Sequence, residues 1–154
     1  MSEQQIKVLY VDDEQNNLFS FKAIFRTDFH IITAISAEEA VKKLALEEFH
    51  VLITDQRMPG MTGVEFLESI LEKYPKPVRI LLTGYTDINA VIDAVNKGKI
   101  FHYLSKPWDE EELRRTIHTA YELYKAREEQ KDMTEKLTYA NEQLEFLLRQ
   151  NLIS

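Results

Sequence analysis

The 154-residue chain contains no cysteine. This absence excludes a disulfide framework, a zinc site built on thiolates and a cysteine nucleophile, and it makes the reducing cytoplasm the expected compartment. The chain also lacks an excess of positive charge, since 26 acidic residues outnumber 19 basic ones for a net charge of −7. A mainly electrostatic grip on nucleic acid or on an anionic membrane surface is therefore not expected. No apolar run is long enough to span a bilayer.

Short apolar runs rich in Val, Ile and Leu recur along the chain, and their length and β-branching predict strands that are buried on both faces. Between them lie segments with helical spacing, one of which has Ser36 as a candidate N-cap and Glu39 as its capping-box partner. Strict alternation of strand and helix predicts a parallel sheet with right-handed crossovers, hence an α/β domain of (βα)5 doubly wound architecture. The predicted strands are Ile6–Val11, His30–Ala34, His50–Thr54, Val78–Thr83 and Ile100–Leu104.

The last predicted helix is long, because neither glycine nor proline occurs after Pro107. We predict one helix from Asp109 to about Ile153. In its final part, one row of mostly apolar residues recurs at alternating steps of four and three residues. This spacing indicates the heptad seam of a coiled coil. The seam consists of Met133, Leu137, Ala140, Leu144, Leu147 and Asn151.

The change in pattern divides the chain into a domain of residues 1–124 and a coiled-coil linker or dimerisation segment of residues 125–154. The seam predicts a parallel homodimer, in which Asn151 at an a position favours a two-stranded coil. The alternative is a lone amphipathic helix that packs on its own domain. We expect the chain to be a fragment of a longer regulator, cut before an output domain. A natural single-domain regulator with a dimerising tail is the other possibility.

Polar side chains stand at the ends of four predicted strands. The first strand ends in Asp12 and Asp13, the third in Asp55, the fourth in Thr83, and the fifth in Lys106. In open parallel sheets ligands bind beyond the carboxyl ends of the strands. Crowded carboxylates repel unless a cation neutralises them, and Mg²⁺ is the usual choice where phosphate chemistry follows. An aspartate there can attack phosphorus to form an acyl phosphate, whose oxygens a lysine and a hydroxyl can then bind.

The fragments around these residues resemble the bacterial response-regulator receiver domain of the CheY-like superfamily. Each fragment alone is a weak signal, but all of them in this order at matching strand ends are highly specific. The resemblance covers about Lys7 to Tyr121 and implies a flavodoxin-like strand order of 2-1-3-4-5. The matching fragments are Val11–Glu14, Ile53–Gly63, Leu82–Gly84 and Tyr103–Pro107.

The resemblance implies that Asp55 is the phospho-acceptor, which takes a phosphoryl group from the phosphohistidine of a histidine kinase or phosphotransfer protein. Asp12 and Asp13 are then the Mg²⁺ acids, joined by Asp55 and by the backbone carbonyl of Arg57. The side chains of Arg57 and Tyr85 flank the path of the hydrolytic water in this family, so they are expected to affect the lifetime of the phosphoryl group.

Three further roles follow from the same resemblance. Lys106 is expected to pair with the phosphate and to precede a cis peptide bond to Pro107. Thr83 is expected to be the switch hydroxyl that moves to the phosphoryl group. Tyr103 is expected to be the aromatic residue that turns inward to fill the space left by Thr83, although a plain core role is also open for it.

The function implied is a phosphorylation-switched receiver of a two-component system, with no turnover on an outside substrate. Its output is expected to be dimeric, such as a cyclic-dinucleotide enzyme, and reached through the long helix. The alternatives are a single-domain receiver that signals by protein contacts and a phosphate-independent interaction module. A haloacid-dehalogenase-like phosphatase is disfavoured, because that class carries its nucleophile in an Asp-x-Asp motif after the first strand. We expect no nucleic acid or membrane partner within this chain.

Overall fold

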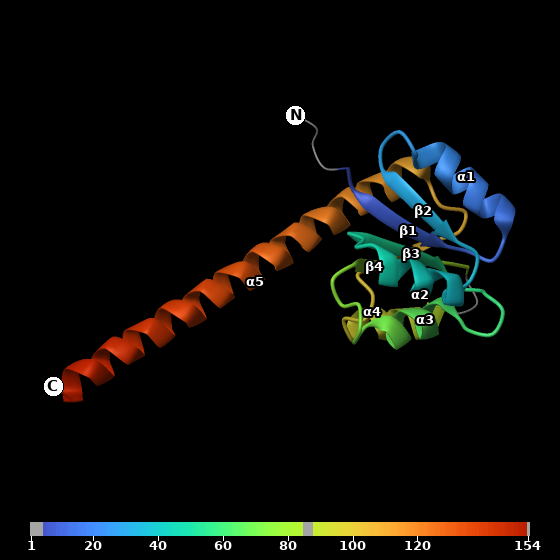
Figure 1. Cartoon of the computed structure of the whole chain (residues 1–154). Coiled ribbons are helices and arrows are strands. Elements are labelled where there is room, and N and C mark those ends of the chain that lie inside the picture. Colours follow the sequence, from blue (N-terminus) through green and yellow to red (C-terminus); the bar gives the residue numbers. More distant parts are fainter. Residues whose placement is uncertain (1–4, 85–87, 154) are drawn as a thin grey trace. The chain divides into compact units, whose positions relative to one another are not determined.

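The computed structural model describes residues 5–84 and 88–153, in which five strands alternate with five helices (Figure 1). Two of the predicted strands have the predicted bounds, and the others are displaced by one or two residues. The elements in chain order are β1 (Lys7–Val11), α1 (Gln15–Phe25), β2 (His30–Ala34), α2 (Ala37–Leu46), β3 (Val51–Asp55), α3 (Gly63–Ile70), β4 (Val78–Thr83), α4 (Ile88–Asn96), β5 (His102–Ser105) and α5 (Glu110–Ile153).

The strands form one parallel sheet in the order β2-β1-β3-β4-β5. This order confirms the predicted (βα)5 doubly wound fold. The chain begins at β1, adds β2 on one side and then returns to place β3 on the other side of β1. The order therefore reverses between β1 and β3, and the carboxyl ends of these two strands lie next to each other. Such a reversal is where open parallel sheets bind their ligands.

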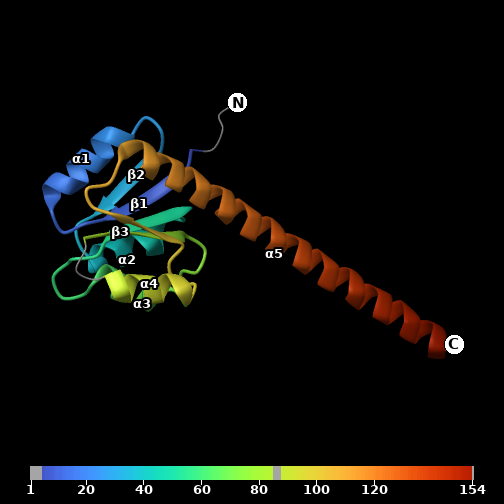
Figure 2. The ribbon, with the colours of Figure 1, turned by 180° about the vertical axis from the view of Figure 1, so that it is seen from behind.

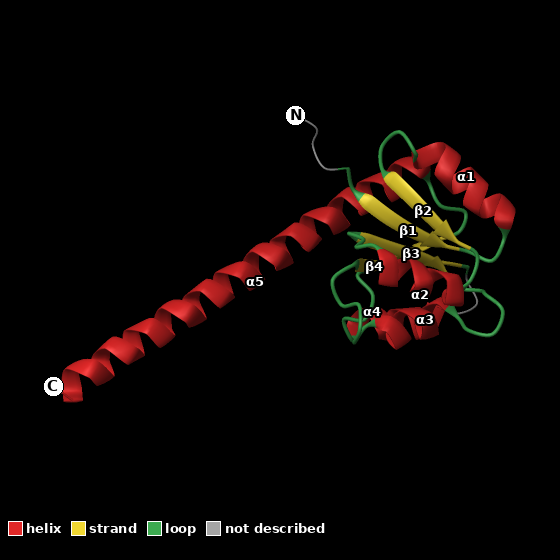
Figure 3. Ribbon diagram, viewed as in Figure 1, coloured by secondary structure: helices red, strands yellow, loops and turns green. Residues whose placement is uncertain are grey.

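Helices cover both faces of the sheet, as the views from opposite sides show (Figures 2 and 3). One face packs against α1 and the first turns of α5, and the other face packs against α2, α3 and α4. Burial on both faces explains why the strands are continuous apolar runs and do not alternate between apolar and polar residues. The residues of α5 that are fully buried in this packing are Leu113, Ile117 and Ala120.

The ends of two helices follow from local sequence signals. Ser36 is the N-cap of α2, as predicted, and its hydroxyl accepts a hydrogen bond from the backbone N–H of Glu39 at 3.1 Å. The Glu39 carboxylate accepts from the N–H of Ile35 at 3.1 Å, so it reaches one residue beyond the predicted partner. After the C-terminal end of α4, Gly98 takes a left-handed conformation with φ of +73°. This conformation stops the helix, as expected for a C-terminal glycine.

Local contacts divide the chain into two compact units, Met1–Tyr124 and Lys125–Ser154. In the second unit the large apolar side chains of the predicted seam are 56–63 % exposed, and these are Met133, Leu137, Leu144 and Leu147. Among the described residues, no helix has both the length and the hydropathy that a membrane span requires.

The start of α3 lies directly against the end of β3. A β-carbon built on Gly63 would lie 2.5 Å from the backbone oxygen of Asp55 and 2.7 Å from Cδ1 of Leu81. The N–H of Gly63 also donates to the backbone oxygen of Gln56 at 2.9 Å. Close approach therefore requires glycine at this position, whatever its backbone torsion angles.

We predict that Gly63→Ala lowers the free energy of unfolding by about 1–3 kcal/mol, because the added methyl group must displace backbone at the end of β3. Urea unfolding followed by circular dichroism measures this change. Gly84→Ala is the matched control, since no described atom lies within 4 Å of a β-carbon built there. The control should stay within about 0.5 kcal/mol of the parent protein. Equal losses in the two variants would contradict the packing argument.

Candidate functional site

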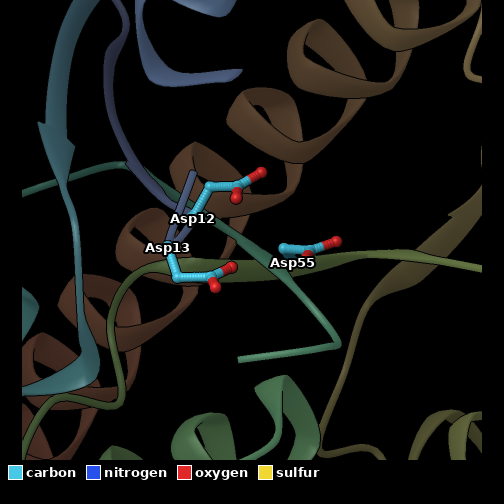
Figure 4. Close-up of side chains that lie close together, drawn as sticks. All are labelled: Asp12, Asp13 and Asp55. Atoms are coloured by element: carbon cyan, nitrogen blue, oxygen red, sulfur yellow. The ribbon is translucent and has the colours of Figure 1, made fainter. Parts of the chain in front are cut away.

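Three carboxylates meet at the carboxyl ends of β1 and β3. Asp12 and Asp13 directly follow β1, whereas Asp55 is the last residue of β3. Each contributes an oxygen atom to a group in which all of these atoms lie within 4.8 Å of one another (Figure 4). Asp12 and Asp55 are buried and Asp13 is half-buried. We call this set of three residues the acid group.

Lys106 reaches the acid group from the end of β5. Its Nζ forms an ion pair with Oδ1 of Asp55. The backbone N–H of Lys106 donates to the oxygen of Thr83 at 2.9 Å, which ties the segment after β5 to the end of β4. The peptide bond between Lys106 and Pro107 is cis, as expected. The structure therefore brings the ammonium group of Lys106 to the Asp55 carboxylate.

Burial shapes the electrostatics of Asp55, whose side chain is only 9 % exposed. Desolvation raises the pKa of the Asp55 carboxyl, and the nearby charges of Asp12 and Asp13 add to this effect. The hydrogen bond and the positive charge of Lys106 oppose the rise without cancelling it. The negative charge of the ionised acid group is thus only partly compensated by the ammonium of Lys106.

Asp12 is held by hydrogen bonds from both β1 and α1. Its Oδ2 accepts from the hydroxyl of Tyr10 at 2.6 Å and from Nδ2 of Asn17 at 3.1 Å, and its Oδ1 accepts from the N–H of Glu14 at 3.0 Å. Burial, followed by the hydrogen bond to Asp12, raises the pKa of the Tyr10 hydroxyl. The sequence reasoning missed Tyr10 and Asn17. The available signal was that Tyr10 precedes Asp12 by two residues and so points to the same face of the sheet.

The loop between β3 and α3 is fixed at both ends by Gln56, which the sequence reasoning also missed as a site residue. Its backbone N–H donates to the oxygen of Leu82 at 2.9 Å, and its side-chain Oε1 accepts from the N–H of Val64 at 2.9 Å. Arg57 begins the loop that these bonds close, and its side chain is exposed. Gln56 therefore anchors the segment that carries the Arg57 carbonyl.

The expected switch residues lie on neighbouring strands. Thr83 is buried at the end of β4, and its hydroxyl donates to the backbone oxygen of Gly84 at 3.0 Å. Tyr103 on β5 is half-buried, pairs with Leu81 of β4 and packs on the face covered by α2, α3 and α4. Tyr85 lies outside the described residues.

The arrangement has the chemistry of a phosphoryl-accepting site. Asp55 offers a carboxylate beside an ammonium group, and the other two acids offer further oxygen atoms. An all-oxygen set with excess negative charge suits a hard dication such as Mg²⁺. The residues present therefore fit the cation that the sequence predicted.

Comparison with known proteins finds a matching family model, curated relatives and solved structures. Residues 8–118 match the family model described as response regulator receiver domain. The hydrogenase transcriptional regulatory protein HoxA of Cupriavidus necator is 41% identical over 122 residues, which are 79% of this chain and 25% of HoxA. This chain spans about a quarter of the length of the curated relatives that it matches.

Two crystal structures share the fold over most of the chain. The crystal structure of adenylate cyclase from Rhodopirellula baltica has a TM-score of 0.83 at 29% identity, and the match covers 86% of this chain and 99% of that one. The signal receiver domain of an HD domain-containing protein from Pseudomonas fluorescens Pf-5 has a TM-score of 0.76 at 32% identity, with 84% and 96% covered.

We predict that Asp13→Asn raises the unfolding midpoint by about 2–4 °C in buffer with a chelator, because it removes one of three crowded negative charges. Thermal unfolding at low and high ionic strength tests this, and the gain should shrink as salt screens the repulsion. Asp93→Asn is the control, since Asp93 is exposed and forms an ion pair with Lys97 at 3.0 Å. It should bring no gain. A variant at Asp13 that is no more stable than the parent would contradict the prediction.

Proposed function

This chain belongs to the response regulator receiver domain family of two-component signalling, and from this membership we propose that Asp55 is the residue that accepts the phosphoryl group. The observation that carries the proposal is the ion pair of Lys106 with Asp55, which is one of the three carboxylates of the acid group. The phosphodonor is the phosphohistidine of a cognate histidine kinase or phosphotransfer protein in the cytoplasm. The receiver has no turnover on an outside substrate.

In the proposed transfer, a carboxylate oxygen of Asp55 attacks the phosphorus atom. The O–P bond forms as the P–N bond to the imidazole breaks, and the bonding electron pair leaves on the imidazole nitrogen. Lys106 passes from the carboxylate to the incoming phosphoryl oxygens, where its positive charge stabilises the developing negative charge. The hydroxyl of Thr83 then donates a hydrogen bond to the same oxygens.

The acid group and the backbone carbonyl of Arg57 are the proposed Mg²⁺ ligands. When bound, Mg²⁺ would neutralise part of the negative charge of the carboxylates and of the phosphoryl oxygens. The support for this assignment is the crowding of the three carboxylates and the anchoring of the Arg57 loop by Gln56. Arg57 and Tyr85 are proposed, from the resemblance to the family alone, to affect the lifetime of the aspartyl phosphate.

The phosphorylated state is proposed to pass through Thr83 and Tyr103 to α5, whose last part forms a parallel homodimer through the predicted seam. The exposure of the seam side chains supports pairing, because covering a row of apolar residues at heptad spacing with a second helix removes apolar surface from water and stabilises the pair. The proposed output is dimeric, such as a cyclic-dinucleotide enzyme, and the structural similarity to a protein described as an adenylate cyclase favours an enzyme. A transcriptional output is the second candidate, because HoxA is a transcriptional regulatory protein.

We predict that Asp55→Asn abolishes phosphorylation by acetyl phosphate in the presence of Mg²⁺, because the amide cannot act as the nucleophile. Mass spectrometry of the intact protein measures the phosphoryl adduct, and circular dichroism checks that the variant is folded. Asp93→Asn changes an exposed aspartate on α4 in the same way and should be phosphorylated as fully as the parent. A full adduct on Asp55→Asn would refute the assignment.

The dimer is tested by sedimentation of the parent and of the double variant Leu137→Lys/Leu144→Lys, each with and without beryllofluoride. The double variant should stay monomeric at concentrations where the parent dimerises, because it places a charge at two seam positions. Tyr139→Lys/Phe146→Lys is the matched control, since these side chains are 65% and 56% exposed but lie off the seam. The control should dimerise like the parent. A parent that is monomeric in both states at high concentration would overturn the proposal.

A further inference from the structure

The carboxylate of Asp12 is fully buried and accepts hydrogen bonds from three groups, all of them uncharged. A carboxylate offers about four acceptor positions, two on each oxygen. The bonds from Tyr10 and Asn17 use both positions on Oδ2, and the N–H of Glu14 uses one on Oδ1. One position remains, on Oδ1. Asp12 can therefore offer only that oxygen to a cation or to a water molecule bound to it.

Tyr10 is itself held rigidly. Its side chain is 2 % exposed and its ring stacks on Phe21 of α1, with centroids 4.0 Å apart and planes 16° from parallel. The ring cannot turn away without opening this packing, so the hydroxyl stays directed at Asp12. At 2.6 Å the bond has the length of a strong charge-assisted hydrogen bond. A phenylalanine at this position would occupy the same space and lose only the hydroxyl.

Asn17 comes from a different element. It lies in the first turns of α1, whereas Tyr10 lies on β1. The carboxylate of Asp12 is thus bracketed between a strand and a helix, and its orientation is set before any cation arrives. Hydrogen-bond partners that orient a metal ligand typically change metal affinity by 10–100-fold when they are removed.

From these contacts we infer that Tyr10 and Asn17 are positioning residues for Asp12, which occupy its Oδ2 and direct its Oδ1 toward the cation. The inference rests on the proposed function of the acid group. A purely structural role predicts a different result, because hydrogen bonds that only satisfy a buried carboxylate stabilise the fold without changing cation affinity.

The experiment is thermal unfolding as a function of Mg²⁺ concentration for the parent, Tyr10→Phe and Asn17→Ala. The midpoint in chelator reports the structural contribution, and its rise with Mg²⁺ reports the dissociation constant, because a ligand that binds the folded state stabilises it by mass action. Each variant should bind Mg²⁺ about tenfold more weakly than the parent.

Two matched controls make the same chemical changes elsewhere. Asn16→Ala removes the exposed amide next to Asn17. Tyr121→Phe removes a hydroxyl from a ring that packs on His50, which precedes the N-terminal end of β3 and so lies at the end of that strand away from the acid group. Both controls should keep the Mg²⁺ affinity of the parent, whatever their stability in chelator.

The outcomes separate the inference from the proposed function. If Tyr10→Phe and Asn17→Ala lose stability in chelator but keep the Mg²⁺ affinity of the parent, the positioning role is wrong and the acid group still stands. If Mg²⁺ does not stabilise the parent at all, the proposed cation role of the acid group fails, and the positioning role fails with it.

Discussion

Three carboxylates meet at one point because β1 and β3 are adjacent parallel strands, and this crowding of like charge is the constraint on which the rest of the structure depends. It arises from the reversal of strand order, which places the carboxyl ends of the first and third strands side by side. Lys106 compensates part of the charge, yet burial still raises the pKa of Asp55. The site therefore keeps an excess of negative charge, which a bound cation would offset.

A repulsive group of charges persists only where the surrounding structure holds it in place. Here the support comes from several elements. Gln56 closes the loop after β3 through the N–H of Val64, and Gly63 lets α3 begin against the backbone of Asp55. Tyr10 and Asn17 hold Asp12 from the strand and the helix. Packing and uncharged hydrogen-bond donors thus offset the repulsion among the three carboxylates. Because these donors carry no charge, they leave the net negative charge of the acid group unchanged.

The same receiver architecture occurs in proteins with different names, including a transcriptional regulatory protein, an adenylate cyclase and an HD domain-containing protein. Fold similarity therefore identifies the receiver without identifying the output. The end of α5 lies outside the residues that match the receiver family. Its first turns are buried on the sheet, whereas the side chains at heptad spacing in the second unit are exposed. That change marks the step from the core of the first unit to the exposed helix of the second.

The sequence by itself determined the alternation of strands and helices, the extent of α5 and the presence of acids and a lysine at the strand ends. These features depend on residue type and local periodicity, which are written along the chain. Tertiary structure alone decided which side chains touch. The bonds from Tyr10 and Asn17 to Asp12, the anchoring by Gln56 and the contact that requires glycine at Gly63 all join different elements or loops. Strand periodicity places Tyr10 and Asp12 on one face, but the contacts and their distances follow from how the elements pack, about which periodicity carries no information.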